Sequence, residues 1–178
     1  MNRPEFERQL AQFPLLAYAF FPTDALEFSG RARIICETQC PRFGKSWACP
    51  PAVGTVAECK ARCLAYPSGL LIATVSEVET ADDMAQTLAT RPAHETLTRE
   101  VAALLKEQGC AVYPLSADSC ALCERCTYPA APCRKPEALY PCIESHGILV
   151  TALAEHYKID HRAEEHTVTW FSLLLYRS

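Results

Sequence analysis

The chain has 178 residues, of which 49% are hydrophobic and 21% charged, and this balance excludes whole-chain disorder and a fibrous protein. With 17 Lys and Arg against 21 Asp and Glu, the formal net charge is -4, so the basic excess typical of nucleic-acid binding is missing. The first ten residues form no apolar run, and no apolar stretch approaches the length of a membrane span. We therefore expect a cytoplasmic protein with no nucleic-acid or membrane partner.

The expected elements of the first half follow from apolar periodicity and helix-capping residues. Pro4 suits a first helical position, and Thr55 with Glu58 has the Thr-x-x-Glu form of a capping box. A continuous apolar run with β-branched members is typical of a strand that is covered on both faces. In chain order we expect a helix from Pro4, a strand over 14–21, a loop over 36–54, a helix from Thr55 to about Tyr66 and a strand over 69–76.

The second half predicts a strand-helix-strand unit and two further elements. In chain order we expect a helical region from Thr80 that breaks near Arg91 and Pro92, a strand over 110–115, a loop over 116–137, a helix over 149–156 and a buried strand over 167–176. The two strands that flank the helical region should be parallel and joined by a right-handed crossover. We predict an α/β fold in a single metal-binding domain, residues 1–178, with a mixed sheet that contains this βαβ unit. Two cysteine-rich loops, 36–59 and 120–137, should project from it.

Eleven cysteines are the unusual feature of the composition. A reducing cytosol disfavours a disulfide framework, and an odd number of cysteines cannot pair completely within one chain. Thiolates are also ligands of zinc and of iron-sulfur clusters, and they act as redox groups or nucleophiles. We therefore interpret the cysteines as metal ligands or catalytic groups.

The stronger cysteine pattern lies in the second predicted loop. Cys120, Cys123 and Cys126 are spaced by three residues, and Cys133 follows after six intervening residues. Three evenly spaced thiolates can curl around one inorganic cube while a fourth comes from further along, which is the ligand pattern of a [4Fe-4S] cluster. Zinc is the competing metal, although its sites usually use two separated pairs. A thioredoxin-type pair, Cys120 with Cys123, is a third interpretation that leaves the other two cysteines unexplained.

A second pattern lies in the first predicted loop. Cys40 follows Cys36 after three residues, Cys49 follows after eight more, and Cys59 after a further nine. Cys40 and Cys49 stand among prolines and glycines, and Cys59 falls in the first turns of a predicted helix, where the helix dipole stabilises a thiolate. We predict that these four also form a ligand set, the first in chain order. In the alternatives, Cys63 replaces Cys59, or the pattern consists of scattered buried thiols.

The other candidate residues carry weaker signals. Three cysteines fall outside both sets and are interpreted as structural: Cys63, Cys110 and Cys142. Cations in or beside the loops could raise the reduction potential of an anionic cluster or dock an acidic partner, or they could be ordinary solvated charges. These cations are Arg42, Lys45, Arg125, Arg134 and Lys135. The sequence has no glycine-rich nucleotide loop and no nucleophile elbow.

Two segments resemble the signatures of a known family. KSWACPPAVGTVAECK over 45–60, preceded by Cys36 and Cys40, and CALCERCTYPAAPCRKPEAL over 120–139 are similar to the signatures of uncharacterised cysteine-rich proteins of bacteria and archaea. Members of this family are described as predicted metal-binding proteins, and the resemblance spans about residues 34–157. It implies two ligand sets, Cys36, Cys40, Cys49 and Cys59, and Cys120, Cys123, Cys126 and Cys133. It implies no ligand role for Cys63 and Cys142, and it brings no established reaction.

Three functions are compatible with these patterns. The first is an iron-sulfur protein with two [4Fe-4S] clusters that transfers electrons to or from a partner enzyme, because a cube with four thiolate ligands has no open iron. The second is a binding or assembly module whose loops are stapled by iron-sulfur clusters or zinc. The third is an enzyme that uses a cluster as a Lewis acid, for which one of the eight cysteines should be dispensable. We favour the first function.

Overall fold

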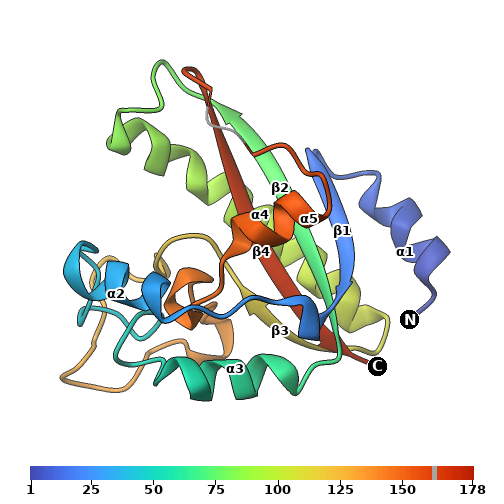
Figure 1. Ribbon diagram of the computed structural model, residues 1–178. Coiled ribbons are helices and arrows are strands. Elements are labelled where there is room, and N and C mark those ends of the chain that lie inside the picture. Colours follow the sequence, from blue (N-terminus) through green and yellow to red (C-terminus); the bar gives the residue numbers. More distant parts are fainter. Residues whose placement is uncertain (162–163) are drawn as a thin grey trace.

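The computed structural model describes residues 1–161 and 164–178. In these residues the strands form one four-stranded sheet with the order β1-β2-β4-β3, and every pair of neighbours in it is antiparallel (Figure 1). The strands are β1 (Ala17–Pro22), β2 (Ser68–Glu77), β3 (Ala111–Leu115) and β4 (Thr167–Arg177). The helices are α1 (Arg3–Leu10), α2 (Gly30–Thr38), α3 (Val56–Leu64), α4 (Met84–Glu107) and α5 (Val150–His156), with single 3-10 turns at η1 (Thr23–Ala25), η2 (Pro136–Ala138) and η3 (Glu144–His146). The predicted α/β class is confirmed.

The predicted βαβ unit is present in a split form. β2 leads through α4 into β3, and both strands pair antiparallel with β4, so β2 and β3 run in the same direction. They are not neighbours, because β4 lies between them, and this corrects the parallel pairing expected of a mixed sheet. Residues 171–176 of β4 are buried without interruption, and a central position in the sheet is the one that covers a strand on both faces.

The alternation of side chains along the strands divides the core into two layers. The layer against α1 and α4 contains Leu70, Ile72 and Leu174 with Phe6, Leu10, Leu97, Val101 and Leu105. The layer against α5 contains Leu71, Ala73, Leu173 and Leu175 with Ile143, Ile148, Leu153 and Ala154. Figure 1 shows α5 in front of the sheet and α4 behind it. Both faces of β2 are therefore covered, as its apolar run predicted.

The predicted capping box at the start of α3 is confirmed. Thr55 Oγ1 accepts a hydrogen bond from the Glu58 amide at 3.2 Å, and Glu58 Oε2 accepts one from the Thr55 amide at 2.7 Å. Two backbone amides that the helix leaves unpaired are thereby satisfied. The result is a fixed starting point for α3, seven residues after Cys49.

α2 is an element that the sequence analysis did not predict. Ser29 caps it, with its Oγ accepting from the Arg31 amide at 3.1 Å, and Cys36 lies on its buried face. The prediction of a loop over 36–54 is therefore wrong for residues 36–38, which belong to α2. The helix is short, and Ile34 and Ile35 are both 56% exposed, so its apolar residues do not follow one buried stripe.

The predicted break at Arg91 and Pro92 is also wrong, because α4 continues through Pro92. Thr96 Oγ1 donates to the Pro92 carbonyl at 3.0 Å, and Trp170 Nε1 of β4 donates to Thr90 Oγ1 at 2.8 Å. His94 Nε2 also lies 2.8 Å from Ser172 Oγ of β4, so contacts with the sheet hold the helix on both sides of the proline, which alone would favour a kink or a break.

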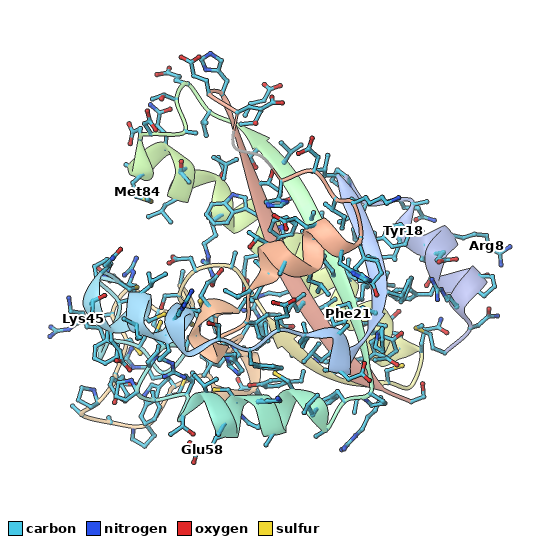
Figure 2. All side chains as sticks on the ribbon, viewed as in Figure 1. Arg8, Tyr18, Phe21, Lys45, Glu58 and Met84 are labelled. Atoms are coloured by element: carbon cyan, nitrogen blue, oxygen red, sulfur yellow. The ribbon has the colours of Figure 1, made fainter. Side chains whose placement is uncertain are left out.

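The cysteine-bearing segments lie at the end of the molecule opposite α1. Figure 1 places α2, α3 and the irregular chain between β3 and α5 together, and Figure 2 shows Lys45 at this end and Arg8 of α1 at the other. Among residues 1–161 and 164–178, none of the helices combines the length and the apolar character of a membrane span.

Candidate metal centres

The four cysteines of the second predicted set lie around one pocket, which holds about 340 Å³ of empty space, part of it open to solvent. We call it the quartet pocket, and its lining includes Cys120, Cys123, Cys126 and Cys133 with Ser46, Trp47, Arg134 and Lys135. All four cysteines are partly exposed. The pocket therefore lies at the surface.

Hydrogen bonds from side chains to backbone carbonyls shape the loop around the quartet pocket. They run from Lys135 Nζ to Leu122 O (3.2 Å), from Arg134 Nη1 to Arg125 O (2.9 Å), from Thr127 Oγ1 to Pro132 O (2.8 Å) and from Trp47 Nε1 to Ala131 O (3.2 Å). The ring of Trp47 also meets Tyr128 edge-on, with 4.9 Å between ring centroids. Because Trp47 comes from the first cysteine-bearing segment, the two segments form one structural unit.

Hydrogen-bond donors around Cys126 favour its thiolate. Burial raises the pKa of Cys126, but the amides of Tyr128 and Trp47 and the hydroxyl of Ser46 donate to the sulfur and bring the pKa below its usual value. Amide donors to sulfur also raise the reduction potential of an iron-sulfur cluster. The pKa of Cys120 is raised, first by burial and then by the neighbouring sulfurs of the quartet.

Three cysteines of the first predicted set lie around a second pocket, together with one that the sequence analysis left out. We call it the α2 pocket, and its lining includes Cys36, Cys40, Cys49 and Cys142 with Arg42, Phe43, Asp118, Ser119 and Ser145. Cys36 and Cys49 are only 8% and 4% exposed, whereas Cys40 is partly exposed. Burial raises the pKa of Cys36 to about 11, with further contributions from Cys40 and Glu144.

The predicted ligand Cys59 lies outside the α2 pocket. Its sulfur is fully buried, donates to Val53 O at 3.4 Å, and accepts from Arg62 Nη2 at 3.1 Å and Arg33 Nη2 at 3.8 Å. Cys63, the alternative, is fully buried in the core layer against α5, where burial raises its pKa to about 12. The ligand sets stay predictions, but the structure separates Cys59 from the other three cysteines of its set.

The two pockets adjoin each other through one dipeptide. Ser119 lines the α2 pocket, and the next residue, Cys120, lines the quartet pocket. Cys49 Sγ lies 3.2 Å from Ser119 Oγ. One hydrogen bond and one stretch of backbone therefore connect a cysteine of each candidate centre.

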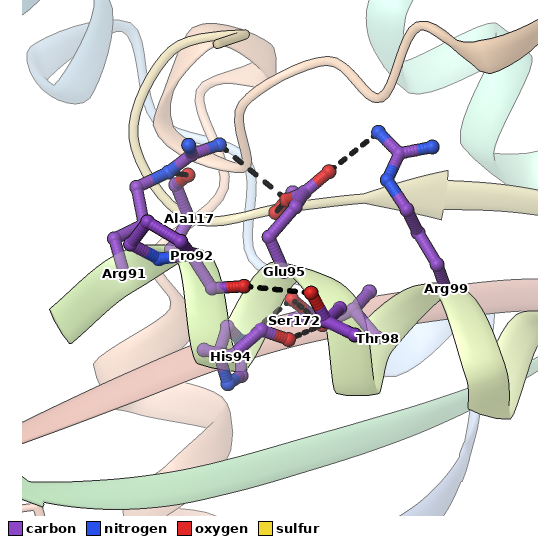
Figure 3. Close-up of polar contacts among 10 residues, drawn as sticks. Arg91, Pro92, His94, Glu95, Thr98, Arg99, Ala117 and Ser172 are labelled. Atoms are coloured by element: carbon purple, nitrogen blue, oxygen red, sulfur yellow. Dashed lines mark hydrogen bonds and ion pairs between the residues drawn. The ribbon is translucent and has the colours of Figure 1, made fainter. Parts of the chain in front are cut away.

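α4 fixes the segment that leads from β3 to this dipeptide. The contacts join Arg91 Nε to Ala117 O (2.8 Å), Ser116 Oγ to Glu95 Oε2, Arg91 Nη2 to Glu95 Oε2 (3.4 Å) and Arg99 Nη2 to Glu95 Oε1 (2.6 Å) (Figure 3). The guanidinium of Arg99 also lies 4.1 Å from the centroid of the Tyr140 ring. Glu95 and its two arginines thus hold the chain just before Cys120 and just before Cys142.

The basic residues divide between pocket linings and open surface. Arg42 lines the α2 pocket, and Arg134 and Lys135 line the quartet pocket. Lys45 and Arg125 are exposed and belong to neither lining. Arg134 and Lys135 also hold the loop by hydrogen bonds, so Lys45 and Arg125 are the better probes of charge alone.

Cys142 is the pocket residue that sequence reasoning missed. It follows Pro141 in an irregular stretch, as Cys49 precedes Pro50 in one, but no spacing pattern connects it with the other cysteines of the pocket. Within the residues that the structure describes, no three His, Cys, Asp or Glu side chains are gathered closely enough to bind a single metal ion. The described structure therefore presents two cysteine-lined pockets rather than a ligand cage.

The α/β fold and the two cysteine-lined pockets at one end of it place the protein in the class of cysteine-rich proteins with candidate metal centres. Residues 19–176 match the family described as predicted metal-binding protein (DUF2284). Because this match covers most of the chain, the protein belongs to that family, and the resemblance found in the sequence is confirmed. No curated protein and no solved structure matches the chain.

Proposed function

We propose that the chain is an iron-sulfur protein that holds a [4Fe-4S] cluster at each pocket and transfers electrons to or from a partner protein in the cytoplasm. The observation that carries this proposal is the lining of the quartet pocket by Cys120, Cys123, Cys126 and Cys133. That lining contains no His, Asp or Glu, so its donors are sulfur alone, and soft thiolate sets select iron-sulfur clusters or zinc over harder metal ions.

The rest of the quartet lining suits an anionic cluster. Trp47, Leu122 and Leu139 contribute apolar surface, while Arg134 and Lys135 contribute positive charge. Cys126 receives backbone amide donors, which would stabilise its thiolate in a ligand role. These side chains would hold the group, limit its contact with water and compensate its negative charge.

The closeness of the two pockets supports electron transfer. When bound, each cluster would supply a one-electron couple. The contact of 3.2 Å between Cys49 Sγ and Ser119 Oγ, followed by the backbone to Cys120, gives a short route between the centres. The partly exposed quartet cysteines place one end of this route at the surface, where a partner could dock.

Protein purified without air should be brown and contain about eight iron and about eight acid-labile sulfide per chain, as two cubes require. Elemental analysis and a sulfide assay measure both quantities. Colourless protein with stoichiometric zinc and no sulfide would contradict the proposal.

A metal-stapled binding or assembly module is the second candidate. The observation that favours it is the irregular chain between β3 and α5, where the described residues form no regular structure beyond single 3-10 turns and isolated bridges. Metal ligation would order such a segment. Redox titration followed by electron paramagnetic resonance separates the two, because electron transfer requires reversible reduction without loss of iron.

A further inference from the structure

The backbone around Cys142 holds this residue beside the first cysteine-bearing segment. The Cys142 amide donates to Ala48 O at 3.4 Å, so Cys142 lies next to the residue that precedes Cys49. Cys142 also forms a parallel bridge with Ser116, in which the Ile143 amide donates to Ser116 O at 3.1 Å. These bonds connect three segments that are distant in sequence.

The side chain of Cys142 faces the α2 pocket. It lines that pocket with Cys36, Cys40 and Cys49 and is itself only 8% exposed. Its Sγ donates to Glu144 Oε2 at 2.8 Å, and the carbonyl of Glu144 lies 3.9 Å from Cys36 Sγ. Four thiols from α2, the chain after it and the segment before η3 therefore surround one space.

Cys59 has a different environment, which accounts for it without a metal. Its sulfur hydrogen bonds with two arginines and one carbonyl, and it is absent from the α2 pocket lining. A role as a ligand at that pocket would therefore require the sulfur to give up its contact with Arg62 Nη2 at 3.1 Å. The role that fits these contacts is to anchor α3 to the segment over 53–54, where Arg33 and Arg62 also donate to Gly54 O and Val53 O.

We propose that Cys142, and not Cys59, is the fourth cysteine ligand of the centre at the α2 pocket. This inference rests on the proposed function, because it presumes a cluster there. In this arrangement three ligands of the first centre come from the segment over 36–49. The fourth, Cys142, follows all four cysteines of the second set in sequence. Both centres then have four thiolate ligands and no open position.

The test compares single Cys→Ser variants of the full-length protein, purified without air. Iron and sulfide content, electron paramagnetic resonance and Mössbauer spectra are measured for Cys142→Ser, Cys59→Ser and the wild type. Cys110→Ser is the matched control, because Cys110 is equally buried but lies in the core layer against α4. Far-UV circular dichroism confirms that each variant is folded.

Cys142→Ser should lose about half of the iron, or keep it with one altered cluster spectrum, while the second cluster is unchanged. Cys59→Ser and Cys110→Ser should keep the wild-type iron content and spectra. Full iron with unchanged spectra in Cys142→Ser would overturn the inference, as would loss of one centre in Cys59→Ser or loss of both in Cys142→Ser. Wild-type protein without iron and sulfide would instead contradict the proposed function itself.

Discussion

His94 lies between two hydroxyl groups in the core beneath α4. Its Nδ1 is 2.8 Å from Thr74 Oγ1 and its Nε2 is 2.8 Å from Ser172 Oγ, while Thr98 Oγ1 donates to Ser172 Oγ at 2.9 Å. Figure 3 shows His94, Thr98 and Ser172 together. Burial lowers the pKa of His94 to about 4, so the ring is neutral near pH 7 and serves as a buried hydrogen-bonding group.

This lowered pKa predicts acid sensitivity of the fold. The unfolded chain takes up a proton near pH 6.5, whereas folded His94 does so only near pH 4, so stability is lost as the pH falls between these values. The contribution of His94 between pH 7 and pH 5 is about 2 kcal/mol. Urea unfolding at several pH values should therefore show a shallower pH dependence for His94→Gln than for the wild type. If the free energy of unfolding depended on pH identically in the two proteins, the lowered pKa of His94 would be contradicted, whatever the absolute stability of the variant.

The elements that the sequence predicted correctly are those specified by local patterns. The Thr55 and Glu58 box, the apolar run of β2 and the helix that begins near Pro4 each depend on neighbouring residues. The errors arose where distant contacts decide the structure. α4 continues through Pro92 because β4 and the core hold both sides of the proline, and β4 separates β2 from β3 because its own buried run needs a central position.

At the level of α4, Glu95 is the residue that joins the helix to the cysteine-bearing chain. Glu95→Gln would leave Arg91, whose side chain is 7% exposed, without a carboxylate partner. We expect the free energy of unfolding to fall by about 3 kcal/mol, the lower end of the range for a broken buried ion pair. Urea denaturation measures this, and Glu100→Gln, on the exposed side of the same helix, is the matched control with a change within about 0.5 kcal/mol. Equal effects of the two substitutions would show that the Arg91–Glu95–Arg99 contacts do not stabilise the fold.

At the scale of the whole molecule, the candidate site resembles the fold in what could be predicted: the sequence indicates the part formed by neighbouring residues, and long-range contacts decide the rest. The quartet was predictable because its four cysteines are close in sequence and share one loop. Cys142 was not, because a bridge to Ser116 and a hydrogen bond to Ala48 bring it to the α2 pocket from a distant part of the chain. Spacing rules assign ligands within a segment and carry no information about such long-range contacts.

If the protein transfers electrons as proposed, the cations at the cysteine-bearing end should affect the rate of electron exchange. Lys45 and Arg125 are exposed there and line neither pocket, so changing both to Glu should slow oxidation of the reduced protein by the anion ferricyanide several-fold at low salt. The same double variant should react faster with a cationic cobalt complex, and both differences should shrink as salt is added. Stopped-flow absorbance measures the rates, and iron content verifies that the centres are intact.

Arg8→Glu is the control for this experiment, because Arg8 is exposed on α1 at the far end of the molecule (Figure 2). Its rates with both oxidants should stay within a factor of about two of the wild type. Equal slowing by Arg8→Glu and by the double variant would indicate that only net charge matters, and that electrons do not leave through the cysteine-bearing end.

The central position of β4 has a consequence for biosynthesis. It is the last of the described strands to leave the ribosome, and in the described sheet β3 has no other partner strand. Every cysteine of both pockets is therefore translated before the sheet that supports them can close. Under the proposed function, nascent chains arrested before residue 167 should therefore not retain iron, whereas the full chain should.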